Sequence, residues 1–297
     1  MKIFFLLAGI VYSKSLWTLF YTCATKEVAN QCNESFTMDQ VGYANLGFTA
    51  NLTTVAEGFA LQPPIRSLFA VHDIFFRNGQ GLNPTWRTEW TSAKVALKPF
   101  LAQGSVLGVF IGDELISGGK VTYAEFMTCL EAVSELKADH PSLFTWLNEG
   151  GTSWTEVFKK VGGLPAKLDI ISLDDYSLSV QQHRSFYEQS IYPLMNSKQS
   201  AFLVPGAFAT RGNSSWTSQS QWCCGGDTPE ACDECMVNRT QGFWQWALED
   251  PRITGMAPWH WDTRGKDEVS KFKEVGVADM PKLKSLWKHI HDTTSNV

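Results

Sequence analysis

The sequence lacks any run of lysine or arginine. Its 25 basic residues are outnumbered by 30 acidic ones, which gives a formal net charge of −5. Proteins that bind nucleic acid need a basic surface for the phosphates, so we expect no nucleic-acid partner. Beyond the N-terminal stretch no apolar run is long enough to cross a bilayer, so no integral membrane segment is expected.

Motifs for phosphate groups and metals are missing as well. No predicted strand is followed by a glycine-rich phosphate loop, which disfavours an open nucleotide-binding sheet. The His-Glu-x-x-His metal motif does not occur, and no cofactor is expected. Tryptophan, in contrast, is abundant, with twelve residues among 297. So much indole favours a surface that stacks on flat or amphipathic ligands.

The N-terminus has a basic start at Lys2, a short apolar centre and small residues after it. This pattern is typical of a secretory signal peptide that is cut near Ser13 or Ser15. We therefore assign residues 1–15 to the signal peptide and residues 16–297 to one mature domain. The expected location is outside the cell or in the lumen of the secretory pathway.

Sequons and cysteines agree with secretion. Asn-x-Ser/Thr glycosylation sequons occur at Asn33, Asn51, Asn213 and Asn238. Seven cysteines in an oxidising compartment predict up to three disulfides and one free thiol, for which buried Cys129 is the candidate. Cys23 and Cys32 are close enough in sequence to pair. Disulfides are favoured over zinc for the cluster of Cys223, Cys224, Cys232 and Cys235.

Apolar strand-like runs alternate with helical patterns through the mature chain. The predicted strands are 15–23, 41–49, 65–73, 106–115, 143–149, 168–176, 201–209 and 253–261. The predicted helices are a weak one near 28–29, then 51–61, 84–102, 122–138, 154–161, 185–196, 242–249 and 282–292. Eight such units predict an α/β fold, a single-domain (β/α)8 TIM barrel, with a Cys-rich insertion at 210–241 after the seventh strand. An open doubly wound sheet is the alternative, and the oligomeric state stays open.

Polar side chains gather at the C-terminal ends of the predicted strands, which is the end that carries the site in this fold. In chain order they are His72 and Asp73, Asp113 and Glu114, Asn148 and Glu149, Asp174, Asp175 and Tyr176, and Trp259, His260, Trp261 and Asp262. Alternation along the strands predicts which of these face the barrel centre. The expected inward residues are Glu114, Asp174, Tyr176, Trp259 and Trp261, whereas Asp113, Asp175 and His260 reach the centre only if the strand ends curl.

Two carboxylates beside aromatic platforms suit glycoside hydrolysis. One acid protonates the leaving oxygen, and a second group attacks or stabilises the sugar carbon. We assign Glu114 as the general acid, with Asp113 or Asp174 as the second carboxylate. The alternative for Glu114 is a solvated residue at the rim.

The same residues carry a family resemblance. Phe110-Ile111-Gly112-Asp113-Glu114 resembles the strand-four acid motif of hexosaminidases of glycoside hydrolase family 20. Segments 169–176 and 255–259 are similar to the sixth and eighth strands of family 18 chitinases, although the three Asp that precede the chitinase Glu are absent. The resemblance implies that Glu114 is the acid and that Asp113 orients the substrate's acetamido nucleophile. It further implies that Tyr176 helps Asp113 and that Trp259 is the sugar platform.

The larger clan of retaining glycosidases, with an Asn-Glu acid on strand four and a nucleophilic Glu on strand seven, fits less well. Residues 205–208, at the end of the seventh predicted strand, include no carboxylate. Asn148-Glu149 resembles the clan's Asn-Glu motif but falls on the fifth predicted strand. A miscount by one strand would make Glu149 the acid.

The sequence thus predicts a secreted glycoside hydrolase that acts on an oligo- or polysaccharide. The family resemblance implies amino sugars in that substrate, and the sugar itself stays open. The predicted catalytic residues are Glu114, Asp113, Asp174 and Tyr176. The predicted substrate-binding residues are Trp259, Trp261, His260, His72, Asn148, Glu149 and Asp175. One alternative is a non-catalytic, lectin-like sugar-binding barrel. Another is a metal-dependent barrel hydrolase or lyase, with His72, Asp73, Glu114, Asp174 and His260 as ligand types.

Overall fold

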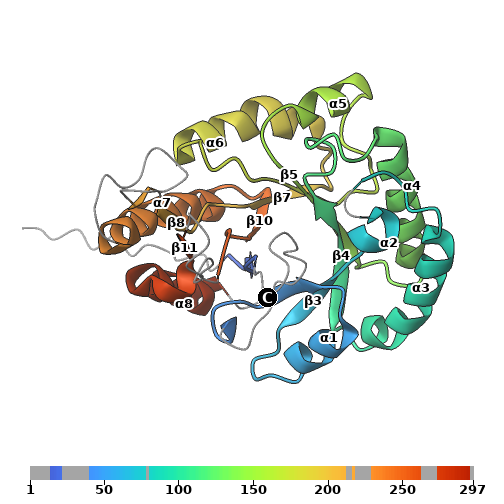
Figure 1. The fold of residues 1–297 in the computed structure, drawn as a ribbon, viewed down its shortest axis with the longest axis horizontal. Helices are drawn as coiled ribbons and strands as arrows, with labels where there is room; N and C mark the ends of the chain where they lie inside the picture. Colours follow the sequence, from blue (N-terminus) through green and yellow to red (C-terminus); the bar gives the residue numbers. More distant parts are fainter. Residues whose placement is uncertain are drawn as a thin grey trace, which may run out of the picture.

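The protein folds as a ring of eight parallel strands with helices around its outside (Figure 1). The computed structural model describes residues 14–21, 40–77, 80–211, 216–217, 229–261 and 273–294. The strand order is β1-β10-β7-β6-β5-β4-β3-β2. The strands are β1 (Trp17–Thr18), β2 (Leu46–Thr49), β3 (Arg66–Ala70), β4 (Val106–Asp113), β5 (Phe144–Glu149), β6 (Ile170–Leu173), β7 (Ser200–Leu203) and β10 (Ile253–Met256). This is the predicted (β/α)8 barrel. Each strand lies in a segment that the sequence predicts to be a strand, except that β7 begins one residue earlier, at Ser200.

The ring closes between its first and last members through Asn45. The backbone N–H of Asn45 donates to the carbonyl of Thr18 over 3.0 Å. Its side chain accepts from the N–H of Thr18 at 2.8 Å and donates to the carbonyl of Leu16 at 3.1 Å. These three hydrogen bonds of Asn45 take the place of the backbone ladder that the short strands β1 and β2 do not form. The barrel is therefore nearly closed.

Local capping signals begin several helices where the sequence predicts them. Asn51 caps α1 by accepting from the N–H of Thr53, and Thr122 forms a capping box with Glu125 at the start of α4. The helices are α1 (Leu52–Phe59), α2 (His72–Phe75), α3 (Trp86–Ala102), α4 (Tyr123–Ser134), α5 (Trp154–Lys160), α6 (Val180–Phe186), α7 (Pro229–Glu249) and α8 (Pro281–Thr294). No helix among these described residues is long and apolar enough to cross a membrane.

Several predicted boundaries are wrong. Helix α3 begins at Trp86 rather than at Pro84, because Asn83 accepts from the N–H of Thr85 and forms a separate turn before the helix. Helix α6 begins at Val180, where Ser179 and Gln182 form a capping box, and continues as a π turn over Tyr187–Ile191. Local side-chain bonds of this kind decide helix ends more than apolar spacing does.

The insertion after the seventh strand also differs from the predicted loop. Its second half is helical, because α7 begins at Pro229. A small antiparallel sheet, β11 (Lys273–Val275), β8 (Ala209–Arg211) and β9 (Trp216–Thr217), accompanies it. Cys129 is a buried free thiol on α4, as predicted. The weak helix near 28–29 and Cys23, Cys32, Cys223, Cys224, Asn33, Asn213 and Asp262 lie outside the described residues, and the disulfide pairing stays a prediction.

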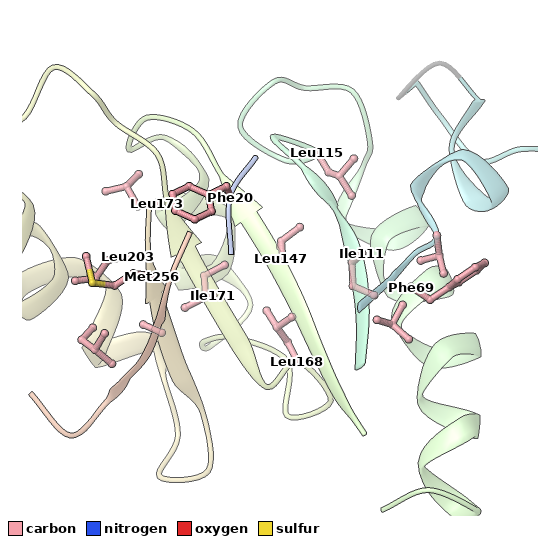
Figure 2. Close-up of a cluster of buried hydrophobic side chains, with 14 of the residues drawn as sticks. Phe20, Phe69, Ile111, Leu115, Leu147, Leu168, Ile171, Leu173, Leu203 and Met256 are labelled. Carbon is pink, nitrogen blue, oxygen red and sulfur yellow. The ribbon is translucent and has the colours of Figure 1, made fainter. Parts of the chain in front are cut away.

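The core has two layers, one inside the ring and one between the ring and the helices. Large rings fill the inside, where Phe110 packs against Phe48 and Trp146 with centroids 4.6 Å apart in both pairs. The outer layer is mainly aliphatic and includes Ile111, Leu147 and Ile171, whose side chains point from the strands toward the helices (Figure 2). The barrel interior is thus a packed core rather than a channel, and a ligand must bind at one of its ends.

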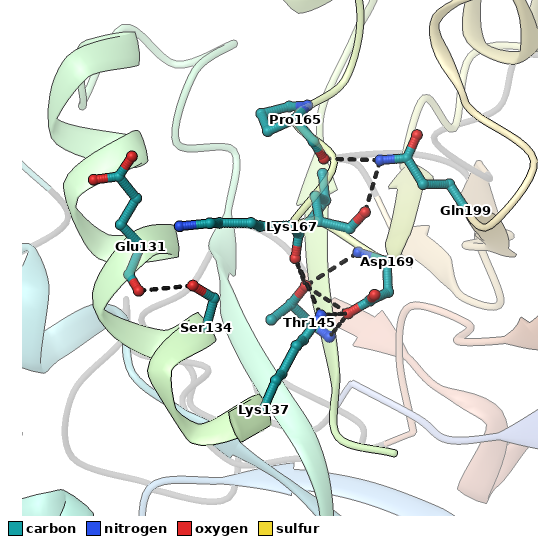
Figure 3. A network of polar contacts seen from close by, with 9 residues as sticks. Glu131, Ser134, Lys137, Thr145, Pro165, Lys167, Asp169 and Gln199 are labelled. Atoms are coloured by element: carbon teal, nitrogen blue, oxygen red, sulfur yellow. Dashed lines mark hydrogen bonds and ion pairs between the residues drawn. The ribbon is translucent and has the colours of Figure 1, made fainter. Parts of the chain in front are cut away.

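A polar network fixes the amino-terminal ends of β5 and β6, opposite the strand ends that carry the predicted site (Figure 3). The carboxylate of Asp169 accepts from the backbone N–H of Thr145 at 2.7 Å and from its hydroxyl at 2.9 Å. It also pairs with Lys137 from the turn that follows α4. Thr145 is fully buried, so these bonds set the register of β5 where it enters the barrel.

We predict that Asp169→Ala lowers the free energy of unfolding by roughly 1–3 kcal/mol, because it leaves the buried N–H of Thr145 without its acceptor. The Thr145 hydroxyl keeps the carbonyl of Lys167 as an acceptor. Denaturant unfolding measures this change. Glu131→Ala is the matched control, since Glu131 is exposed on the neighbouring α4 and is expected to change stability by no more than about 0.5 kcal/mol. Equal effects in the two variants would contradict the role of Asp169.

Candidate active site

A β-bulge turns the end of β4 toward the barrel axis. The pairing of β4 with β5 shifts between Phe110, opposite Trp146, and Gly112, opposite Leu147. The extra residue places Asp113 opposite Asn148, on the inner face. The sequence predicts that Asp113 reaches the centre only if the end of the strand curls, and the bulge supplies this departure from simple alternation.

Asp113 is held by the strand beside it. The side-chain amide of Asn148 donates to Asp113 Oδ1 over 2.6 Å, and Asn148 in turn accepts from the hydroxyl of Ser172 on β6. The pKa of Asp113 is raised to about 6, mainly by burial and also by the charge of Glu114, against the lowering effect of the Asn148 bond. Asp113 is thus a fixed carboxyl that titrates close to neutral pH.

Glu114 follows directly in a left-handed backbone conformation, with φ of 49°. No other non-glycine residue among those described has positive φ, and such strain is concentrated at functional sites in proteins. Its side chain is 44% exposed, and Lys120 Nζ lies 4.0 Å from Oε2. Exposed pairs at this distance are weak, so Glu114 remains accessible to a ligand.

Asp174, after β6, meets Glu114 above Gly150. A Cβ placed on Gly150 would lie 2.2 Å from Glu114 Oε1 and 3.0 Å from Asp174 Oδ1. The two carboxylate oxygens are therefore at most the sum of these distances apart, about 5.2 Å. Asp174 Oδ1 is buried without a hydrogen-bond partner. Burial, followed by the charges of Asp113 and Glu114, raises the pKa of Asp174 well above its usual range.

Tyr176 lines the same group of acids. Its hydroxyl donates to Asp174 Oδ2 over 3.4 Å, and its ring packs edge-on against Phe208. Gly206 allows this approach, since a Cβ there would be 3.2 Å from the ring. Burial and the charge of Asp174 raise the pKa of the Tyr176 hydroxyl, which therefore stays protonated and can donate a hydrogen bond.

Glu149 ends β5, which confirms its predicted strand, but its side chain is fully buried. Its carboxylate accepts from the backbone N–H of Ile116 at 2.9 Å and of Ser117 at 2.8 Å. Burial raises the pKa of Glu149 to about 7, although these N–H groups act in the opposite direction. Glu149 therefore lies beneath the loop that carries Glu114, away from solvent.

Trp259 and Tyr21 form the aromatic side of the site. Trp259 is half-buried after β10, and its ring lies 5.1 Å from that of Tyr21. Tyr21, which is not among the predicted site residues, follows β1 and lies near Asp113. Burial raises the pKa of Tyr21, and the charge of Asp113 contributes to this shift. Trp17 and Leu19 both pack in the interior cluster. Side chains alternate along a strand, so the same pattern would have predicted that Tyr21 points inward.

The other predicted residues lie farther from these acids or deeper in the protein. His72 begins α2, with its ring 3.5 Å from the Asp73 carboxylate and edge-on to Phe110. Asp175 accepts from the N–H and hydroxyl of Ser177 in a turn at the start of the β6–α6 connection. These residues border the site from β3 and β6 without joining its carboxylates.

Trp261 does not face the barrel centre, and that prediction is wrong. It is fully buried in the outer layer, 4.8 Å from Phe20 and 5.1 Å from Tyr43 between ring centroids. His260 is also fully buried and stacks on Phe208. Strand β10 ends at Met256, so strand alternation no longer applies at these positions.

Metal ligation by the acids and histidines has no support in the part of the chain that the structure describes. No group of three His, Cys, Asp or Glu residues has an arrangement that could hold a metal ion there. The ligand types proposed for a metal-dependent barrel, which include His72 and His260, therefore do not converge.

Comparison with known proteins places the fold. No protein-family model matches the sequence, and no curated protein matches it. Among solved structures, xylanase 10B from Thermotoga maritima matches with a TM-score of 0.57 at 11% identity, over 96% of this chain and 98% of the xylanase. Xylanase 10B from Thermotoga petrophila RKU-1, in complex with xylobiose, matches with a TM-score of 0.54 at 10% identity, over 94% of each chain.

A third structure, a GH2 beta-galacturonidase from Eisenbergiella tayi, matches with a TM-score of 0.53 at 12% identity. The match covers 88% of this chain but 46% of that enzyme. Identities this low show the fold alone, which is a (β/α)8 barrel that glycoside hydrolases also use. The finer resemblance to families 20 and 18 is not confirmed by these matches.

We predict that the protein becomes less stable as pH rises from about 5 to 8. Glu149 has a folded-state pKa of about 7, above the unfolded value near 4.5, so the folded state binds its proton more tightly. The stability this gives is complete below pH 4.5 and is lost by pH 7, a difference of roughly 3 kcal/mol. The free energy of unfolding, measured with denaturant at pH 5 and at pH 8, tests this prediction.

Glu149→Gln is expected to lose less stability than the wild type over this pH interval, because its side chain does not titrate. Glu156→Gln, at an exposed position on α5, is the control and is expected to behave as the wild type. A wild-type pH dependence that survives unchanged in Glu149→Gln would assign the effect to other groups.

Proposed function

We propose that the protein is a glycoside hydrolase that cleaves glycosidic bonds in an oligo- or polysaccharide. The observation that carries the proposal is the convergence of Glu114 Oε1 and Asp174 Oδ1, at most about 5.2 Å apart, above Gly150. Carboxyl groups about 5–5.5 Å apart suit retaining hydrolysis, in which one acid protonates the leaving oxygen and the other attacks the sugar. Inverting enzymes need a wider gap of about 6.5–9.5 Å. The xylanase-like barrel fold supports the same class of reaction.

Glu114 is the proton donor in this proposal and Asp174 the nucleophile. Burial and the charges of Asp113 and Glu114 raise the pKa of Asp174. The first step requires that Asp174 gives up its proton while Glu114 carries one. Glu114 is the more exposed member and can reach a leaving oxygen, while Asp174 is held below it by Tyr176. Trp259 offers its half-buried ring to the sugar face.

We predict that Glu114→Gln lowers kcat by roughly 10²–10⁴-fold on natural linkages, which need a general acid. The loss is expected to be much smaller on aryl glycosides whose phenol leaves without protonation. Asp174→Ala is expected to lose activity on both substrates and to be partly restored by azide, which replaces the missing nucleophile. Sugar binding, measured by calorimetry, is expected to remain in both variants. Equal losses of Glu114→Gln on both substrates would contradict its role as the acid.

A second candidate uses the acetamido group of an amino sugar as the nucleophile, with Asp113 as its partner. The favouring observation is that Asp113 is fixed by Asn148 next to Glu114 and close enough for its charge to raise the Tyr176 pKa. In the same assays, Asp113→Asn would then remove activity on N-acetylated substrates, while Asp174→Ala would matter less. A lectin-like protein would bind sugar without turnover in the wild type and in every variant.

We propose further that the chain is secreted and that its signal peptide is cut between Ser13 and Lys14. The ammonium group of Lys14 donates to the carbonyls of Ala247 at 2.6 Å and Asp250 at 2.5 Å, at the end of α7. A cut after Ser15 would remove these bonds and expose the helix end.

The prediction is that the mature protein, expressed in a eukaryotic secretory host, begins at Lys14. Mass spectrometry of its N-terminal peptide checks this. A mature chain that begins at Leu16 would show that the Lys14 contacts are absent from the secreted form.

A further inference from the structure

Three consecutive residues at the end of β5 contact every carboxylate of the candidate site or the backbone that carries it. The carbonyl of Asn148 accepts from the N–H of Glu114 at 3.0 Å, and the carbonyl of Glu149 accepts from the N–H of Asp174 at 3.1 Å. The Asn148 side chain holds Asp113. Gly150 lies under the carboxylates of Glu114 and Asp174, where a side chain would collide with Glu114. The end of β5 is therefore the common support of the site.

The Glu149 side chain is the part of this support that has no direct contact with a reacting group. It is fully buried, and burying a carboxylate is unfavourable unless its oxygens are satisfied. Both of them accept backbone N–H groups of the loop after Glu114, from Ile116 and Ser117. The hydroxyl of Ser117 accepts in turn from the N–H of Gly150 at 3.2 Å, so strand and loop are bonded in both directions.

The loop needs such a clamp because of the conformation of Glu114. A non-glycine residue at φ of 49° is strained and keeps that conformation only where the surroundings hold it. On one side, Glu114 is held by its N–H bond to Asn148. On the other, the two N–H groups bound by Glu149 lie two and three residues further along the chain, and they fix the direction in which the loop leaves.

We propose that Glu149 is a positioning residue that holds Glu114 in its strained conformation, and so holds its carboxylate beside Asp174. The proposal rests on the proposed function for its catalytic consequence, but the clamp itself can be tested without any turnover.

The first experiment measures hydrogen exchange at the amides of Ile116 and Ser117 in the full-length secreted protein. Above the Glu149 pKa of about 7 the ionised side chain offers two acceptor oxygens, whereas Glu149→Gln keeps its size but offers one; exchange is therefore measured near pH 8. Exchange of at least one of these amides is expected to accelerate by about tenfold or more. Glu149→Asp keeps both oxygens and is expected to change exchange less. Glu156→Gln is the matched control and leaves both amides as in the wild type.

The second experiment compares kcat and KM on a natural-linkage substrate. A displaced proton donor lowers kcat more than it raises KM, by up to about 10²-fold for a shift near 1 Å. Glu149→Gln is expected to show this split, and Glu149→Asp to recover part of kcat. Gly150→Ala moves the Glu114 carboxylate directly and is expected to lower kcat while the two amides stay protected.

Unchanged exchange at both amides in Glu149→Gln overturns the proposal. So does faster exchange with an unaltered kcat. If Glu149→Gln does not fold, the Glu149→Asp variant decides by the same two measurements, with intermediate effects expected. If the wild type hydrolyses no glycoside, the proposed function fails, while the exchange experiment still supports or overturns the clamp.

Discussion

The burial of carboxylates close to one another is the constraint on which the organisation of this site depends. Burial raises the pKa of Asp113 and of Asp174, and the charge of Glu114 adds to the effect on both. Folding offsets this cost with fixed donors, which are the amide of Asn148 and the hydroxyl of Tyr176. Such an arrangement retains a proton near neutral pH, which is what the proposed acid catalysis would use.

The two ends of the barrel differ in how well their buried polar groups are hydrogen-bonded. At the amino-terminal ends of the strands, the carboxylate of Asp169 accepts a hydrogen bond from Thr145 and forms an ion pair with Lys137. At the other end Asp174 Oδ1 is buried without a partner. Unsatisfied polar atoms are costly in a folded protein, so this atom lowers stability at the end of the barrel that carries the candidate site. The packed aromatic interior separates the two ends and supports both.

The fold was readable from the sequence because the strands are short apolar runs separated by amphipathic helices. The carboxyl ends of these strands are also rich in polar residues, so the sequence alone predicts that Glu114 and Asp174 lie at the same end of the barrel. The inward turn of Asp113 was not readable. It depends on the pairing of Phe110 and Gly112 with the next strand, which no pattern within β4 reports. The burial of Glu149 likewise depends on a loop contact. Trp261 was misplaced because alternation was extended beyond the end of β10.

The bulge in β4 has a consequence for how this barrel can diverge. The residue that causes it lies between Phe110 and Gly112 in a strand whose outer face is aliphatic. A shortened strand without that residue would lose the buried Ile111 side chain from the outer layer, which lowers stability. It would also rotate the acidic pair that follows by one step of the pleat. Loss of a single codon would thus turn both acids away from the positions that the proposed chemistry needs, and a later insertion at the same place would turn them back.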